Sequence, residues 1–544
     1  MKAKKWIALV LAMLMVAAIF TACTNSETPS NNGGGNSGNS GNNNNGGGNS
    51  GNSGNNNGGG DSGNTDDEDE EMVNITFWFP DLGGTTGSAP KANDVIAALN
   101  EITEEQINVH VDVVWFTGLG DYGTQLVLGI ANKEAIDVAL YMPSGGAGYI
   151  NLLANKCMMD ITDITAEYGK DLMALFGEDL MAGTVIDGRL YGCSTYRQLN
   201  SNWYINMRTD ILEQLNLMDQ ATSMKTWADY EALMETVKNA GVVQYAVGAG
   251  GGHGFVPDSG CIFGGTYLSD TIAFDTLGDS LYTIMTDQDG HVYSMVETDE
   301  CLQQFKMFAN WMAAGYVYPD TPYDQDSYQA VMGKGIEFSS LCMSEFGVEV
   351  NWKQSTNYDL TCIQLTPGYL STAVCQKFGI FVPSTAKEPE AAVKFINLLY
   401  TTPELMNLVV WGIKDETYVV NDKGEACYPE GTDRSTCGYH GMDFCIGNQF
   451  LCMPWEGNGT NFRAEALEDF KNAPVSKYMG LTVDTSTIDD LVAALSAVCE
   501  EFRGIMASGY YTDSLYKEYV DKLHAAGVDD YVDFYQNAVN DFIA

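Results

Sequence analysis

Several aromatic residues stand beside polar or charged residues, either where a strand is expected to end or in stretches that carry Gly or Pro. Flat Trp and Tyr faces can stack on the C–H faces of pyranose rings, while polar neighbours fix hydroxyl groups, and ligand sites combine apolar walls with a few such groups. The chemistry that these residue types favour is therefore non-covalent recognition. The candidate binding residues are Trp78, Asp81, Tyr141, Tyr196, Arg197, Trp352, Trp455 and Glu456.

Catalytic and metal-binding patterns are absent from the sequence. It contains no GxSxG motif of serine hydrolases, no HExxH motif of zinc proteases and only five His. Among 72 acidic residues, pairs of carboxylates that could serve a glycoside hydrolase occur throughout the chain, so such pairs do not indicate an active site. The Gly-rich run from Gly248 lacks the spacing of a phosphate-binding loop. The stretch from Asp287 to Gly290 begins like an EF-hand loop but has Thr298 at the twelfth position, so a hairpin turn is the better interpretation. We expect no catalytic residue, no metal and no cofactor.

Cysteines are numerous but scattered. Of the 13 in the chain, twelve follow Cys23, and none forms a CxxC pair, which argues against zinc and redox motifs. Most stand in apolar context, where Cys behaves as a small hydrophobe, so mostly free thiols are expected. A disulfide remains possible within the run Cys427, Cys437, Cys445 and Cys452.

Alternating strand and helix patterns position the first candidate residues. Strands are predicted at 73–79, 109–115 and 136–142, with helices around 95–99 and 122–131 between them. This alternation predicts a parallel α/β sheet. Ligands bind beyond the carboxyl ends of such strands, which is where Trp78, Asp81 and Tyr141 stand.

Two further stretches are predicted to cross between lobes. In the first, Asp187-Gly188 favours a tight turn, and two strand-like runs then flank a polar segment, so that the crossing spans 196–203. The second crossing spans 375–382, ahead of an amphipathic helix that begins at Pro389. An ordinary hairpin followed by a helix is the alternative for the first stretch.

The N-terminus predicts an exported, anchored protein. Lysines precede a short apolar run, a pattern that is typical of a secretory signal peptide. The run ends in Phe20-Thr21-Ala22-Cys23, which looks like a bacterial lipobox, although Phe20 stands where that motif usually has Leu. Cys23 would then be acylated, leaving the protein on the extracellular face of the cell membrane. The Asn-, Gly- and Ser-rich tract and the acidic run that follow it have the composition of a disordered tether.

Size and charge limit the remaining possibilities. The chain has 544 residues, and the part after the tether is too long for one hydrophobic core, so at least two lobes are expected. A net charge of −45 argues against binding nucleic acid. The predicted organisation is a signal peptide at 1–22, a lipidated Cys and linker at 23–71, one lobe at 72–198 and 378–450, and a second at 199–377 and 451–544.

Four motifs resemble those of family 1 extracellular solute-binding proteins, the carbohydrate-type binding components of ABC importers. They are DGRLYG followed by YINMRTDIL, then DGHVYSMVETDE with ANWMAAGYVYPD, then VPSTAKEPEAAVKFINLLYTTPEL, and finally WGIKDETYVVNDKG. The third is the most specific match. The resemblance implies a two-lobed, periplasmic-binding-protein-like α/β fold, in which each lobe is a mixed sheet flanked by helices and hinge segments join the lobes.

The same resemblance implies a function. The protein would be a monomeric, membrane-anchored lipoprotein that captures a sugar or oligosaccharide between its lobes and delivers it to ABC permease subunits, without being an enzyme. The acidic balance of the chain favours a neutral oligosaccharide. The alternatives are an extracellular glycan-active hydrolase and a sensor or peptide-binding lipoprotein that takes no part in transport.

Overall fold

The computed structural model describes residues 71–81, 87–116, 119–248, 274–279, 281, 283–324, 326–366 and 368–544. The chain divides into two compact units, Met1–Glu68 and Asp69–Ala544, and all described residues belong to the second. Cys23 and the predicted signal peptide lie outside the described residues, as does nearly all of the predicted linker.

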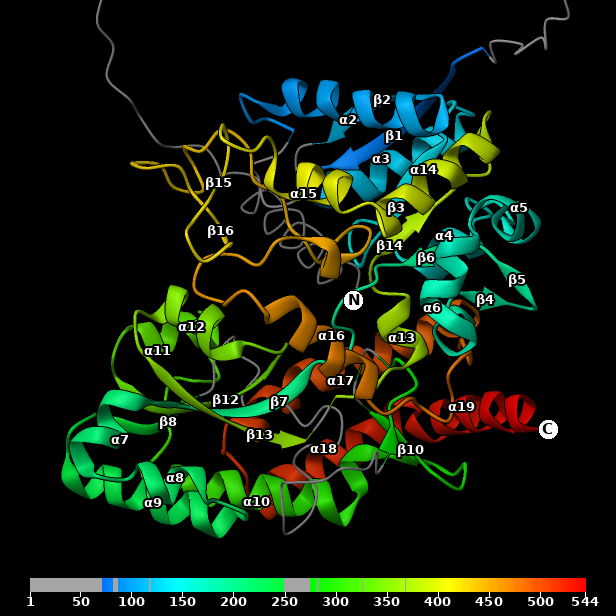
Figure 1. Ribbon diagram of the computed structural model, residues 1–544. Coiled ribbons are helices and arrows are strands. Elements are labelled where there is room, and N and C mark those ends of the chain that lie inside the picture. The colour runs from blue at the N-terminus through cyan, green and yellow to red at the C-terminus, as the bar shows by residue number, and fades with distance from the viewer. Residues whose placement is uncertain are drawn as a thin grey trace, which may run out of the picture. The chain divides into compact units, whose positions relative to one another are not determined.

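The first sheet has five strands in the order β2-β1-β3-β14-β6 (Figure 1). Strand β1 lies between β2 and β3 and pairs in parallel with both, as predicted. Strand β14 pairs antiparallel to β3 and to β6, so the sheet is mixed. The strands are β1 (Val73–Pro80), β2 (Val109–Phe116), β3 (Val138–Tyr141), β6 (Cys193–Ser194) and β14 (Gly379–Phe381).

Helices and a small hairpin accompany this sheet. The predicted helix at Pro389 is confirmed, with Pro at the first turn, where its missing N–H costs nothing. Asp187 and Gly188 have φ of 51° and 75°, the left-handed pair that a tight hairpin requires, so the predicted turn is also confirmed. The elements are α2 (Ala92–Ile107), α3 (Leu119–Ala131), α4 (Tyr149–Ala154), α5 (Thr162–Tyr168), α6 (Lys170–Ala182), β4 (Val185–Ile186), β5 (Arg189–Leu190), α14 (Pro389–Thr401) and α15 (Pro403–Trp411).

The second sheet has four strands in the order β13-β7-β12-β8. β7 pairs antiparallel to β12 and β13, and β12 pairs in parallel with β8. Ile205, Phe338 and Trp311 belong to a hydrophobic core that is separate from that of the first sheet. The elements are β7 (Asn202–Arg208), α7 (Thr209–Leu215), α8 (Met218–Thr222), α9 (Trp227–Ala240), β8 (Tyr245–Gly248), α11 (Tyr328–Gly333), β12 (Glu337–Ser344), α12 (Val348–Thr356) and β13 (Leu360–Thr366).

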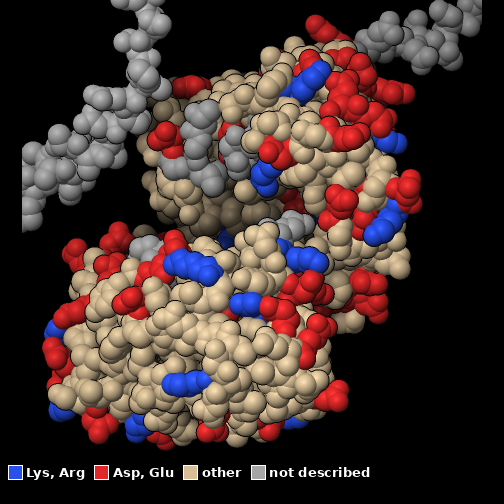
Figure 2. Space-filling view, turned by 90° about the vertical axis from the view of Figure 1, so that its left-hand side faces the viewer, with Lys and Arg blue, Asp and Glu red and all other residues tan. Residues whose placement is uncertain are grey.

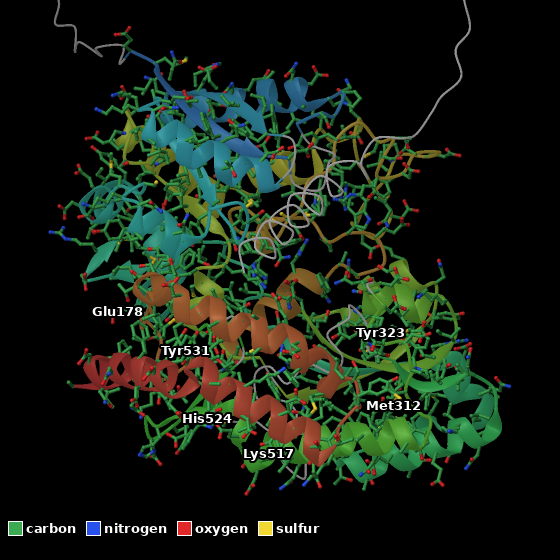
Figure 3. All side chains as sticks on the ribbon, turned by 180° about the vertical axis from the view of Figure 1, so that it is seen from behind. Glu178, Met312, Tyr323, Lys517, His524 and Tyr531 are labelled. Carbon is green, nitrogen blue, oxygen red and sulfur yellow. The ribbon has the colours of Figure 1, made fainter. Side chains whose placement is uncertain are left out.

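A third core forms around the C-terminal helices, which Figure 3 shows from behind. Phe502 and Tyr519 stack there with ring centroids 5.2 Å apart, and Phe305 of α10 belongs to the same cluster. Its elements are β9 (Phe274–Asp275), β10 (Ile284–Asp287), β11 (Val292–Ser294), α10 (Asp299–Ala313), α17 (Asp489–Ala507), α18 (Asp513–Ala526) and α19 (Val528–Ile543). The remaining elements are α13 (Thr372–Cys375), β15 (Val419–Val420), β16 (Ala426–Cys427), α16 (Phe462–Asn472) and the 3-10 turns η1 (Met295–Glu297), η2 (Gln449–Leu451) and η3 (Thr485–Ile488).

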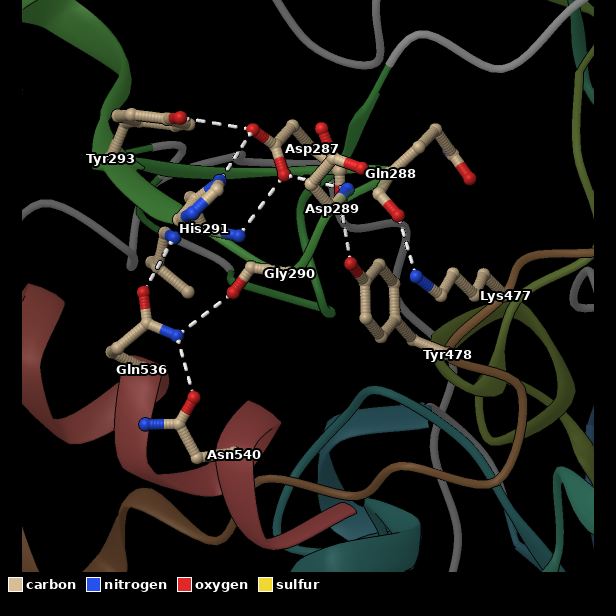
Figure 4. A network of polar contacts seen from close by, with 11 residues as sticks. Asp287, Gln288, Asp289, Gly290, His291, Tyr293, Lys477, Tyr478, Gln536 and Asn540 are labelled. Atoms are coloured by element: carbon tan, nitrogen blue, oxygen red, sulfur yellow. Dashed lines mark hydrogen bonds and ion pairs between the residues drawn. The ribbon is translucent and has the colours of Figure 1, made fainter. Parts of the chain in front are cut away.

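The hairpin predicted at Asp287–Gly290 is confirmed, because β10 and β11 pair antiparallel across it (Figure 4). The Asp287 carboxylate accepts hydrogen bonds from the backbone N–H groups of Asp289 and His291 and from the Tyr293 hydroxyl. Desolvation raises the pKa of Asp287, but these bonds outweigh it and lower the pKa to about 2. The carboxylate therefore stabilises the turn.

Gln536 of α19 ties the same hairpin to the C-terminal helices. It donates to the Gly290 carbonyl at 2.8 Å and accepts from the Val292 N–H at 2.9 Å. Tyr478 also donates its hydroxyl to the Asp287 carbonyl (Figure 4). The hairpin is thus fixed from two distant parts of the chain.

The chain crosses twice between the two sheets, and the two connections run side by side. The first connection lies where it was predicted, at 196–203. The second runs from the end of β13 at Thr366 to the start of β14 at Gly379, so the predicted range 375–382 covers only its last residues and β14 itself. The chain passes from β6 in the first sheet to β7 in the second, and returns from β13 to β14. The Thr195 N–H donates to the Phe378 carbonyl at 3.0 Å, and the Gly368 N–H donates to the Asn202 side chain at 2.6 Å. Tyr196 is also bonded to a third segment, since its N–H donates to Gly447 and its carbonyl accepts from Gln449.

Neither a membrane-spanning helix nor a metal site is present in the described part of the chain. None of its helices has the length and apolar character needed to cross a bilayer. In the same described part, no three side chains of His, Cys, Asp or Glu are grouped so that they could hold a metal ion. The eleven described cysteines after Cys23, including Cys427, Cys437, Cys445 and Cys452, are free thiols.

His524, which is labelled in Figure 3, belongs to α18. Its ring lies between two carboxylates. Its Nδ1 is 2.9 Å from Asp529 and its Nε2 is 3.0 Å from Glu297. Hydrogen bonds to Asp529 and then to Glu297 raise the pKa of His524 above its ordinary value. These contacts stabilise the folded protein. The stabilisation is fully present at pH values below about 6.5, the pKa of His in the unfolded chain, and it is lost as the pH rises through the higher pKa of His524 in the folded protein.

Glu297→Gln is therefore expected to lower the free energy of unfolding in acid more than in alkali. The loss should be under about 1 kcal/mol because the pair is solvent-exposed and screened. Urea unfolding of both proteins at pH about 5.5 and about 8.5 measures the difference. A difference that is the same at both pH values would contradict this assignment.

Candidate functional site: an aromatic cavity beside the crossings

A cavity of about 560 Å³ lies beside the crossing segments and is bordered by residues next to both sheets. Met343 and Ser344 come from the end of β12 in the second sheet, and Phe378 directly precedes β14 in the first. Aromatic rings make up much of the lining. They are Phe346, Trp352, Phe378, Trp411, Tyr428, Phe444, Trp455 and Phe462, together with the imidazole of His440.

Trp455 lies at the centre of an aromatic group in this wall. Its ring centroid is 4.8 Å from that of Trp411, 4.6 Å from Tyr428 and 4.8 Å from His440. Backbone bonds fix it, because the Ala426 N–H donates to Pro454 and the Glu456 N–H donates back to Ala426, both at 2.8 Å. The Trp455 segment is thus held along β16 like an added strand.

His440 is electrically neutral at pH 7. Burial and, to a smaller extent, the nearby positive charge of Arg434 lower its pKa to about 4, although the charge of Asp443 acts to raise it. Its ring lies 5.0 Å from that of Trp411. His440 therefore contributes a flat aromatic face to the cavity and no charge.

Two ion pairs supply the strongest polar groups. Arg197, on the first crossing, lies 3.0 Å from Glu345 after β12, and Arg463 of α16 lies 2.5 Å from Asp443. Burial raises the pKa of Glu345, and the opposing charge of Arg197 acts to lower it. The first pair joins residues that are 148 positions apart in the sequence, and the second joins residues that are 20 positions apart.

Some buried polar atoms of the lining have no hydrogen-bond partner in the described part of the chain. They are the Nε of Arg197, the Nε2 of Gln198 and the Oδ1 of Asn458. Burying a polar group without a partner costs about 1–3 kcal/mol, so native proteins rarely leave one unpaired. These atoms are suited to bond a polar ligand.

Of the predicted site residues, the structure brings Arg197, Trp352 and Trp455 together in this cavity. Trp352 lies on α12 and is only 3% exposed, packed among Tyr204 and Val348. Arg197 also borders a second cavity of about 530 Å³, together with Trp203 and Tyr369.

The other predicted residues do not line either cavity. Trp78 is 7% exposed and packs against Phe116 with centroids 4.7 Å apart. Gly129 makes room for it, since a Cβ there would lie 2.5 Å from the Trp78 ring. Tyr141 is fully buried, and its hydroxyl donates to the Cys375 carbonyl at 2.9 Å. Both side chains are part of the first core.

The remaining three predicted residues have separate surroundings. Tyr196 is buried against Phe176, Phe450 and Phe470. Asp81 is buried and accepts a hydrogen bond from the Ser88 hydroxyl at 3.2 Å. Glu456 is exposed beside Trp455.

Sequence reasoning missed several lining residues that lie outside regular elements or at their ends. They are Lys377, Trp411, Tyr428, Arg434, His440 and Arg463. Three of the six, Tyr428, Arg434 and His440, fall between α15 and α16, where only the short β15, β16 and η2 interrupt about fifty residues of irregular chain. Long irregular connections in compact domains are usually functional, and this signal could have found them.

Comparison with known proteins assigns the chain to a family. Residues 97–412, more than half of the chain, match the sequence profile of bacterial extracellular solute-binding proteins. The chain belongs to this family, and its fold is the two-lobed α/β fold of solute-binding proteins, as predicted.

Named relatives and solved structures agree with this assignment. A carbohydrate ABC transporter substrate-binding protein of Streptococcus pneumoniae is 20% identical over 445 residues, covering 80% of this chain and 84% of that protein. The crystal structure of the N-glycan transport solute binding protein of Streptococcus pneumoniae is 17% identical, covers 86% of this chain and 99% of that one, and has a TM-score of 0.71. The crystal structure of an extracellular solute-binding protein from Bifidobacterium longum subsp. infantis is 13% identical in sequence and has a TM-score of 0.60. The match covers 87% of this chain and 98% of that one.

Proposed function

We propose that this protein binds a sugar or oligosaccharide in the aromatic cavity and presents it to the permease subunits of an ABC importer. The observation that carries the proposal is a wall of aromatic faces around Trp455 beside buried, unpartnered polar atoms of Arg197 and Gln198. Aromatic faces stack on pyranose rings, and such polar atoms bond hydroxyls. The S. pneumoniae N-glycan transport protein has also been solved in complex with Man1GlcNAc and with Man5GlcNAc, which supports the same ligand class here.

A saccharide panel tests this function. Titration calorimetry of the purified protein against mono- and oligosaccharides should give a dissociation constant for at least one of them. The saccharides should also be recovered uncut after prolonged incubation, because we propose a binding protein and not a glycan-active hydrolase. Failure of every saccharide to bind, or release of shorter products, would refute the proposal.

Binding is proposed to close the two lobes. We assign residues 72–198 and 378–450 to one lobe, and 199–377 and 451–544 to the other, although Cys452 and Phe470 pack with the core of the first sheet. Closure about the crossings should be a hinge motion. Small-angle scattering should therefore give a smaller radius of gyration with saturating saccharide than without, and superimposable curves would contradict closure.

We also propose that the protein is held on the outer face of the cell membrane by a lipid on Cys23. A diacylglyceryl group supplies two acyl chains, and each buried CH₂ contributes about 0.8 kcal/mol, which suffices for stable anchoring. Cys23→Ala should release the protein into the medium or leave it unprocessed, as membrane fractionation would show. Unchanged recovery in the membrane fraction would contradict the anchor.

A further inference from the structure

The second cavity adjoins the aromatic cavity. Their volumes are about 530 Å³ and about 560 Å³, and four of the described residues border both. Arg197 and Ser201 belong to the first connection between the sheets, Met343 to the end of β12, and Lys377 to the second connection. Residues that line two cavities at once stand at their junction. The two cavities therefore meet beside the connections.

Arg197 is fixed at this junction with part of its guanidinium unused. The residue is 7% exposed, and its Nη1 donates to the Gln198 carbonyl at 3.1 Å and to the Glu345 carboxylate at 3.0 Å. Its buried Nε has no acceptor in the described part of the chain. Native proteins rarely leave a buried donor unpaired, so a ligand that passes through the junction would supply the missing acceptor.

The second cavity offers an aromatic ring close to the junction. Tyr369 lines this cavity and is half-buried, and its hydroxyl donates to the Asp275 carboxylate at 3.4 Å, which holds the ring in place. A Cβ on Gly368 would clash with the Ser201 carbonyl oxygen, so the two connections touch there, one residue before Tyr369. An aromatic face beside polar groups is the combination that sugar rings require.

We propose that the bound saccharide is an oligosaccharide long enough to occupy both cavities, with Trp455 and Tyr369 as stacking faces and Arg197 bonded to the part between them. Ligand pockets span about 300–1,000 Å³, so each cavity alone could hold a small ligand. A saccharide that filled only the first would leave the second empty. The proposal rests on the proposed saccharide-binding function and deepens it, because Tyr369 would determine the preferred length.

A length series tests this proposal on the unaltered protein. The probes are malto-, cello- and mannooligosaccharides from the disaccharide to the hexasaccharide, measured by titration calorimetry. They are neutral, because acidic side chains are widespread on the face drawn in Figure 2 and would repel an acidic probe whatever its length. A buried aromatic contact and a hydrogen bond to a charged group are each worth about tenfold or more in affinity. The hexasaccharide of the tightest-binding series should therefore bind at least about tenfold more tightly than its disaccharide, with one molecule per protein.

Tyrosine variants separate the two cavities. Tyr369→Ala should weaken hexasaccharide binding about tenfold and change disaccharide binding less than about twofold, because only the longer ligand reaches the second cavity. Tyr428→Ala should weaken both, because Tyr428 lines the first cavity, which both ligands occupy. Tyr323→Ala is the matched control, since Tyr323 is 74% exposed and borders neither cavity in the described structure (Figure 3). Thermal unfolding of each variant checks that it is folded.

Each result decides the proposal. A hexasaccharide that binds no more tightly than its disaccharide, or two hexasaccharides bound per protein, would overturn the two-cavity ligand and leave the saccharide-binding function intact. A length preference that a folded Tyr369→Ala variant retains would overturn the assignment of Tyr369. Failure of every hexasaccharide to bind would also overturn the proposal, and the proposed function would fail with it only if the whole saccharide panel, monosaccharides included, does not bind.

Discussion

Replacing Trp455 by Ala is expected to weaken saccharide binding about thirtyfold or more. Trp455 lines the cavity within 5 Å of the Trp411, Tyr428 and His440 ring centroids, so its loss removes the central face of the aromatic wall. Removing a buried aromatic contact typically costs over 2 kcal/mol of binding free energy, and every 1.4 kcal/mol is tenfold in dissociation constant.

Titration calorimetry with the tightest-binding member of the saccharide panel measures this effect. Tyr323→Ala is the control, since Tyr323 is an aromatic residue that is 74% exposed and does not line the cavity (Figure 3). The control should bind like the parent protein. If a folded Trp455→Ala variant bound the saccharide as tightly as the unaltered protein does, the ligand would not bind against Trp455 and the assigned site would be wrong.

Replacing Trp78 by Ala is expected to lower the free energy of unfolding by about 3–5 kcal/mol, the usual cost of removing a large buried aromatic. Its ring packs against Phe116 and occupies the space that Gly129 leaves, so the substitution creates a cavity in the first core. Denaturant unfolding measures the loss, and the folded fraction should keep the saccharide affinity of the parent. Normal stability with weakened binding would show that Trp78 belongs to the site.

The fold could be predicted from the sequence because local patterns agreed with the tertiary structure. The alternation in β1 and β2, the amphipathic helix that begins at Pro389, and the Asp187-Gly188 turn are each set by neighbouring residues. The antiparallel placement of β14 between β3 and β6 is set by distant contacts, since Ile380 pairs with Leu140, 240 positions earlier, and with Cys193, 187 positions earlier. No local pattern specifies it.

The candidate site could be predicted only in part, because position along a strand does not decide whether a side chain reaches solvent. Helices cover both faces of such a sheet, so an aromatic residue within a strand is usually core. Trp78 and Tyr141 follow that rule. Trp455 and Arg197 lie outside strands, on irregular segments whose backbone is fixed by distant partners, and both reach the cavity.

A crystal structure of the protein with the tightest-binding saccharide tests the central claim most directly. We predict that a sugar ring stacks on Trp455 and that ligand oxygens lie within about 3 Å of the Arg197 Nε or the Gln198 Nε2. A saccharide bound outside this cavity, for example only in the second cavity beside Trp203 and Tyr369, would contradict the assignment of the site.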